Sequence, residues 1–97
     1  MNNNVRVKMF HTDAGHGWLA VKATELEEFG VADKISSYSY KSGDTVYLEE
    51  DCDAPYFIGA ATSHGVIINF KYGKQRDRSP IRSKERYTPP TAKEVIC

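Results

Sequence analysis

The chain has 97 residues, of which 40% are hydrophobic and 11% aromatic, a composition that suits one small globular domain with a single core. Its 13 Lys and Arg residues balance 13 Asp and Glu residues, and a net charge near zero disfavours a general DNA-binding protein. No apolar run approaches the roughly 20 residues of a membrane helix, and the first residues lack the pattern of a signal peptide. We therefore expect a cytosolic protein with two free thiols, Cys52 and Cys97.

Charge is distributed unevenly along the chain. With 8 of the 13 Lys and Arg residues and 3 of the 13 Asp and Glu residues, positions 71–97 carry a net charge of +5, which leaves −5 on positions 1–70. Either the basic part lies along the acidic body, or it is an arm that contacts phosphate groups.

The first predicted elements are two strands joined by a turn. Residues 5–10 alternate between apolar and polar side chains, which is typical of a strand. Residues 16–22 follow the same pattern, with Trp18 and Leu19 on opposite faces. Because glycines make the segment between them easy to bend, we expect a hairpin-like pair.

A short helix and a second pair of strands are expected next. Thr24 and Glu27 fit a capping box that opens a helix from about Glu25 to Phe29. Residues 34–40 and 45–50 then flank a polar, glycine-containing connection, which indicates another hairpin.

The last predicted elements of the core are a helix and a strand. Asp53 is the expected N-cap of a helix that runs to about His64 and ends at Gly65. Residues 66–72 are the clearest strand in the sequence. The predicted fold is a small α+β domain of order ββαββαβ, with two short helices on a mixed or antiparallel sheet. We expect a core domain at 1–73, a basic arm at 74–87 on or near the core, and a flexible tail at 88–97.

Two polar clusters are candidate metal sites. His11, Asp13 and His16 are residue types that bind zinc or iron, but short His/Asp clusters also brace turns. The acidic run Glu49–Asp53 suits magnesium or calcium, or else a solvated corner at a helix N-terminus. Covalent catalysis through Ser37, Ser39 or Cys52 is disfavoured, because nothing fixes a base beside them and acidic neighbours raise the pKa of Cys52.

The basic arm and a tyrosine–serine segment are candidate recognition elements. Guanidinium groups such as those of Arg78 and Arg82 bind phosphate oxygens, and a tyrosine such as Tyr87 stacks on a base. Tyr38 and Tyr40, which alternate with serines, are typical of a recognition surface.

Four sequence blocks resemble a family of small proteins encoded by bacteriophages and prophages. The blocks are HTDAGHGWLAV at 11–21, KISSYSY at 34–40, VYLEEDCDAPYF at 46–57 and SPIRSKERY at 79–87. The resemblance implies a protein of the host bacterial cytoplasm. Small phage proteins of this kind are often counter-defence or host-takeover factors.

If these blocks come together in the fold, they surround one concave site. The candidate ligand-binding residues are His11, Asp13, His16, Trp18, Ser39, Tyr40, Glu50, Arg78, Arg82 and Tyr87. The leading hypothesis is a non-enzymatic phage accessory protein of the counter-defence type. It would bind a host defence component or its nucleotide signal, need no cofactor, and be able to form a homodimer through exposed strand edges.

Two other functions stay open. The first is a small metal-dependent hydrolase or nuclease that uses zinc, magnesium or manganese, with His11, Asp13, His16 and the acidic cluster Glu49–Asp53 at its site. The second, direct DNA binding or DNA mimicry, is disfavoured by the modest charge of both halves.

Overall fold

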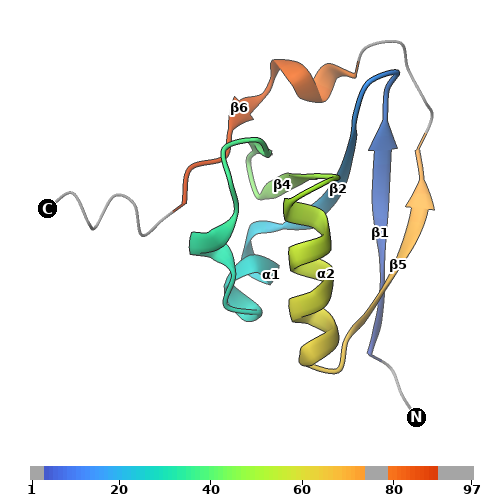
Figure 1. Cartoon of the computed structure of the whole chain (residues 1–97), viewed down its shortest axis with the longest axis vertical. Coiled ribbons are helices and arrows are strands. Elements are labelled where there is room, and N and C mark those ends of the chain that lie inside the picture. Colours follow the sequence, from blue (N-terminus) through green and yellow to red (C-terminus); the bar gives the residue numbers. More distant parts are fainter. Residues whose placement is uncertain (1–3, 74–78, 90–97) are drawn as a thin grey trace, which may run out of the picture.

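The computed structural model describes residues 4–73 and 79–89. They form a six-stranded mixed sheet with two α-helices, so the α+β prediction is confirmed (Figure 1). The strands lie in the order β5, β1, β2, β4, β3, β6, with β1 and β5 parallel. In chain order the elements are β1 (Val5–Thr12), β2 (Gly17–Lys22), α1 (Ala23–Glu28), the 3-10 turn η1 (Ala32–Lys34), β3 (Tyr40–Ser42), β4 (Thr45–Glu49), α2 (Asp53–Ser63), β5 (Ile67–Tyr72), the 3-10 turn η2 (Pro80–Ser83) and β6 (Glu85–Arg86).

The hydrophobic core lies between one face of the sheet and the two helices. Leu19, Val46 and Leu48 are fully buried there because alternate residues of a strand point to the same face. The ring of Phe57 from α2 lies 5.7 Å from the ring of Phe29, at the end of α1. The alternation seen in the sequence therefore separated the two faces of β2 correctly, with Leu19 in the main core and Trp18 on the other face.

The segment predicted as a strand at 34–40 has a different structure. Only its last residue, Tyr40, is in a strand, and the rest forms η1 and a turn. The buried carboxylate of Asp53 accepts hydrogen bonds from the Ser36 amide, the Ser36 hydroxyl and the Ser39 hydroxyl. These bonds hold the segment against the start of α2. They favour a turn at these residues although the local sequence pattern favours a strand. Asp53 is thus the first residue of α2 and not its N-cap, which is Cys52.

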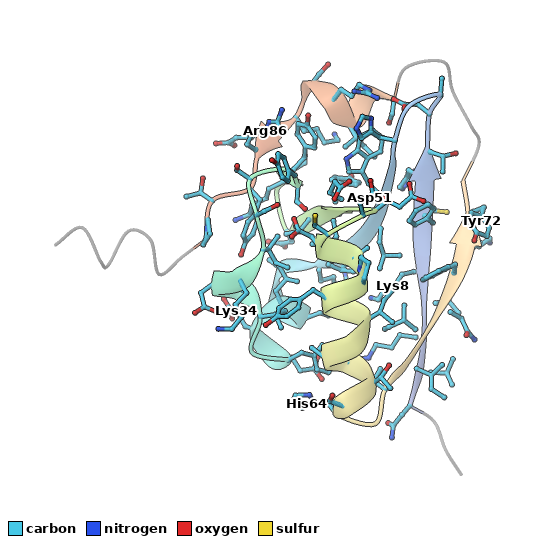
Figure 2. The ribbon with its side chains drawn as sticks, in the orientation of Figure 1. Lys8, Lys34, Asp51, His64, Tyr72 and Arg86 are labelled. Atoms are coloured by element: carbon cyan, nitrogen blue, oxygen red, sulfur yellow. The ribbon has the colours of Figure 1, made fainter. Side chains whose placement is uncertain are left out.

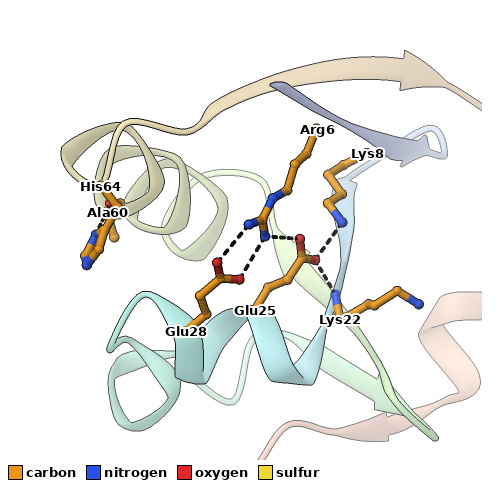
Figure 3. Close-up of polar contacts among 7 residues, drawn as sticks. All are labelled: Arg6, Lys8, Lys22, Glu25, Glu28, Ala60 and His64. Carbon is orange, nitrogen blue, oxygen red and sulfur yellow. Dashed lines mark hydrogen bonds and ion pairs between the residues drawn. The ribbon is translucent and has the colours of Figure 1, made fainter. Parts of the chain in front are cut away.

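The start of α1 also differs from the prediction. The helix begins at Ala23, so Thr24 does not cap it. Instead, Glu25 accepts a hydrogen bond from the Lys22 amide at 2.9 Å. Its carboxylate also contacts Lys8 at 2.6 Å and Arg6 at 2.9 Å, as Figure 3 shows. Burial raises the pKa of Glu25, but the bonds from Lys22, Lys8 and Arg6 outweigh it, so the pKa is lowered overall.

These ion pairs join β1 to α1 in the region where β1 is no longer paired with β2. The register between β1 and β2 covers only Phe10 to Thr12 of β1, whereas β1 pairs with β5 from Val5 to Phe10. Arg6 and Lys8 point from this part of β1 toward α1 (Figure 3). Val5, Val7 and Met9 alternate with them on the opposite face and are exposed.

Residues 79–89 return to the body and extend it. β6 pairs with β3, with Arg86 opposite Tyr40. Ile81 packs on Trp18 and Tyr40 on the face opposite the helices, and Tyr87 joins the main core. Residues 74–78 of the predicted arm (74–87) and residues 90–97 of the predicted tail (88–97) lie outside the described residues.

Candidate functional site

Asp13 joins the β1–β2 turn to the returning C-terminal segment. Its side chain is fully buried, and its Oδ2 accepts hydrogen bonds from Arg82 Nε at 2.6 Å and from the Ser79 amide at 2.9 Å. Its Oδ1 accepts from Arg82 Nη2 and from the Gly15 and His16 amides, at 3.0, 3.0 and 2.9 Å. The bond from Arg82 and these backbone bonds hold the pKa of Asp13 well below its usual range.

His11, Asp13 and His16 do not form a metal-ligand group. Within 4–73 and 79–89, no three His, Cys, Asp or Glu side chains are placed to hold a metal ion. The oxygens of Asp13 are taken up by five donors, and His16 Nδ1 lies 2.9 Å from Arg82 Nη2. Since a guanidinium can only donate, His16 Nδ1 is the acceptor in this contact. The His11 ring lies edge-on to Tyr47, 5.9 Å away.

A pocket of about 420 Å³ opens beside this junction. It lies on the sheet face opposite the helices, where β2, β3 and β4 meet η2 and β6. Figure 2 shows Asp51 and Arg86 in this part of the molecule and Tyr72 at the opposite edge of the sheet. We call it the aromatic–arginine pocket, and its lining residues are His16, Trp18, Tyr38, Tyr40, Glu49, Asp51, Cys52, Arg82 and Arg86.

Two guanidinium groups lie over aromatic rings in the aromatic–arginine pocket. Arg82 is 5.4 Å from the centre of the Trp18 ring, and Arg86 is 4.7 Å from the centre of the Tyr40 ring. Arg86 also donates to the Ser37 carbonyl at 3.0 Å. Stacking of this kind holds each planar guanidinium group close to the ring beneath it, which limits its orientation. Because Trp18 and Tyr40 are buried beneath the arginines, the aromatic ring most open to a ligand is Tyr38, which is 62% exposed.

The opposite wall of the pocket is acidic. Glu49 is buried, and its Oε1 accepts a hydrogen bond from the Cys52 amide at 2.8 Å. Asp51 is exposed beside it. Loss of hydration, and then the negative charges of Glu49, Asp53 and Asp51, raise the pKa of Cys52. This rise in the pKa of Cys52 was predicted from its acidic neighbours in the sequence. A thiol of raised pKa is a weak nucleophile, because less of it is present as thiolate.

The sequence-predicted site residues fall into several groups. His16, Trp18, Tyr40 and Arg82 line the aromatic–arginine pocket, with Asp13 directly behind them. His11 lines a smaller hollow of about 190 Å³ on the same face. Glu50 points instead to a groove on the helix side. Arg78 lies outside the described residues.

Ser39 and Tyr87, also predicted to contact a ligand, are structural residues. Ser39 is fully buried, where it donates to Asp53 at 2.5 Å and accepts from the Glu49 amide at 2.9 Å. The buried Tyr87 hydroxyl donates to the Ala32 carbonyl at 2.6 Å, and its burial, followed by the nearby acids, raises its pKa. The Ser39 side chain therefore braces the start of α2 and the Tyr87 side chain braces η1, and neither lines the pocket.

Several pocket residues were not among the predicted site residues. Arg86 enters because the Tyr40–Arg86 register sets it over the Tyr40 ring. Glu49, Asp51 and Cys52 had been considered only as a metal-binding corner or as nucleophiles. The alternation of tyrosines and serines at 37–40 was the available signal for Tyr38.

Comparison with known protein families, curated proteins and solved structures found no match. In the described part of the chain, neither helix has the length and apolar character needed to span a membrane.

Proposed function

We propose that this protein binds a nucleotide in the aromatic–arginine pocket. The observation that carries the proposal is the meeting of two ring-stacked guanidinium groups, an exposed tyrosine and two carboxylates around a space of about 420 Å³. A space of this size is typical of small-ligand sites. Nucleotides combine an anionic group, a flat ring and hydrogen-bond donors, and each has a complement here.

The charges of the lining side chains indicate which residue contacts which part of the nucleotide. Arg82 is neutralised by Asp13, whereas Arg86 makes no ion pair with any described residue. Arg86 is therefore the group that binds the phosphate. Tyr38 stacks on the base, as exposed aromatic side chains do in single-strand recognition. Glu49 and Asp51 accept hydrogen bonds from the N–H groups on the base edge, which favours a base that has such donors.

The resemblance to phage-encoded proteins gives this binding a biological setting. A small protein that holds a nucleotide without consuming it removes that nucleotide from solution. We propose that the ligand is a nucleotide signal of the host's defence, and that the protein acts as a counter-defence factor in the bacterial cytoplasm.

Binding is tested by isothermal titration calorimetry with a panel of purified ligands. The panel contains the four ribonucleoside 5′-monophosphates, the corresponding nucleosides and inorganic phosphate. A monophosphate is expected to bind more tightly than its nucleoside or phosphate alone. Arg86→Gln is expected to raise Kd by about tenfold, which corresponds to the loss of one charge-assisted contact.

Lys84→Gln is the matched control, because it removes the same charge from a side chain that lies over Tyr47, outside the pocket. Equal weakening by Arg86→Gln and Lys84→Gln would mean that only overall charge attracts the ligand. That result, or a panel without any bound nucleotide, rules out the proposed site.

A further inference from the structure

A second concave region lies on the other side of the sheet, between α2 and the β1–β5 pair. We call it the edge groove; it has a volume of about 490 Å³. The rings of Phe10, Phe70 and Tyr72 form its sheet wall and contact one another at centroid distances of 5.7 to 6.3 Å. Ile58 and Gly59 of α2 form part of the facing wall. The groove shares only a strand-to-helix corner with the aromatic–arginine pocket.

Exposed apolar side chains lie on both faces of the β1–β5 pair. Eight large hydrophobic side chains are exposed among the described residues, and six of them belong to β1 or β5. Four of these six, Val5, Val7, Met9 and Ile67, are on the face away from the helices, whereas Phe70 and Tyr72 line the edge groove. Phe70 is 42% exposed and Tyr72 is 69% exposed. Contiguous exposure of this kind on a small domain marks an interaction surface more often than isolated surface apolar residues do.

The outer edge of β5 is available for strand pairing. β5 is the last strand of the sheet order, and within 4–73 and 79–89 it pairs only with β1. Its outward backbone amides and carbonyls can therefore accept another strand. A segment added at this edge would place alternate side chains over the edge groove.

Gly59 adds an independent observation. It lies within α2, where glycine is unfavourable relative to alanine. A Cβ built at this position meets no atom within 4 Å, so no contact among the described residues requires glycine there. The missing side chain leaves the α2 wall of the groove open for an incoming chain.

Glu50 gives the edge groove its charge. It is the one ionisable acid among the lining residues, it is exposed, and its carboxylate makes no hydrogen bond or ion pair with other described residues. It lies near the Phe10 ring, since a Cβ at Gly17 would meet both at 2.8 to 2.9 Å. A basic side chain is the complement of this end of the groove.

We propose that the edge groove binds an extended segment of a partner protein. The segment pairs with the outer edge of β5, places alternate apolar side chains between Phe70 and α2, and presents an Arg or Lys to Glu50. A second copy of this chain fits less well in a symmetric β5 pairing. The single basic residue of β5, Lys71, is on the face opposite Phe70, so it cannot reach the groove side to meet Glu50.

The proposal is tested with fluorescent nonapeptides by anisotropy titration. One set has Val or Phe at alternate positions and Arg at one end, and a second set has Glu in place of Arg. The Arg set is expected to bind, and to shift the NMR signals of the β5 amides. Glu50→Gln is expected to weaken binding by about tenfold. Asp51→Asn, which neutralises the next residue but leaves the groove lining unchanged, is expected to have little effect.

Gly59→Leu separates binding from folding. Leucine favours the helix over glycine, so the variant is expected to keep or raise Tm while its side chain fills the groove and weakens peptide binding by about tenfold. Gly59→Ala is expected to raise Tm with a smaller effect on binding.

Three results overturn the proposal. They are equal binding of the Arg and Glu peptide sets, unchanged binding by Gly59→Leu, and a dimer of the free protein in native mass spectrometry that Phe70→Lys dissociates. The last result would assign the groove to a second copy.

Discussion

Arg82 binds Asp13 with two hydrogen bonds, of 2.6 and 3.0 Å, across 69 positions of sequence. The contact fixes residues 79–87 against the β1–β2 turn and sets the Arg82 guanidinium over Trp18. The turn that sequence analysis identified as a candidate metal site is therefore an anchor for the wall of the aromatic–arginine pocket.

Asp13→Asn is expected to detach the C-terminal segment. An amide cannot accept both bonds of the guanidinium fork, and its NH₂ group faces backbone donors. Amide hydrogen exchange should accelerate at 79–87 while α2 remains protected. Emission from Trp18, the single tryptophan, should shift to longer wavelength as Arg82 leaves its ring. Asp44→Asn, in an exposed turn, serves as control; unchanged exchange at 79–87 would contradict the anchoring role.

The same carboxylate predicts how stability depends on pH. The pKa of Asp13 is depressed in the folded state, so the unfolded chain takes up its proton first as the pH falls. The stabilisation by Asp13 is fully present above the unfolded-state pKa of about 3.9 and is lost progressively below it. Urea unfolding between pH 7 and 2.5 should show the stability difference between wild type and Asp13→Asn shrinking in acid. A constant difference would contradict this assignment.

Ser39→Ala is expected to destabilise the fold by about 1–3 kcal/mol, since it leaves the buried Glu49 amide without its acceptor and removes a donor to Asp53. Chemical denaturation at neutral pH measures the change. Ser37→Ala is the matched control, because Ser37 is exposed two positions away. Similar losses in both variants would contradict the bracing role of Ser39.

Cys52 is expected to react slowly with iodoacetamide at pH 8. Its raised pKa lowers the fraction of thiolate, which is the reacting form. Asp51→Asn removes one of the charges that raise the pKa and should accelerate alkylation. The measurement uses a Cys97→Ser background so that a single thiol is followed. A rate equal to that of an unperturbed thiol would contradict the effect of the acidic wall.

Local sequence patterns predicted the parts of the fold that depend on local interactions. Alternation of apolar and polar residues identified β2 and β4. Gly65, with φ of +82°, follows the C-cap of α2 and stops the helix there, as expected. The 34–40 segment has an equally regular pattern, yet the carboxylate of Asp53 determines its conformation from 14 to 17 positions away. Sequence spacing carries no information on such a contact.

The candidate site was predictable in composition more than in arrangement. His16, Trp18, Tyr40 and Arg82 were identified from residue type and do lie together. Arg86 and Glu49 join them only because strand register and the return of the C-terminal segment bring them there. Asp13 was predicted as a ligand-binding residue, but its side chain is buried and bonds to Arg82 and Ser79 of the C-terminal segment.

The return of residues 79–87 has a consequence for biosynthesis. Both arginines of the aromatic–arginine pocket are made after every strand of the sheet except β6 and after both helices. A nascent chain that has emerged only as far as Gly73 contains every buried residue of the main core except Tyr87, but the aromatic–arginine pocket still lacks Arg82 and Arg86. The aromatic–arginine pocket is therefore complete only after Arg82 and Arg86 have been added, when Arg82 can pair with Asp13 of the β1–β2 turn.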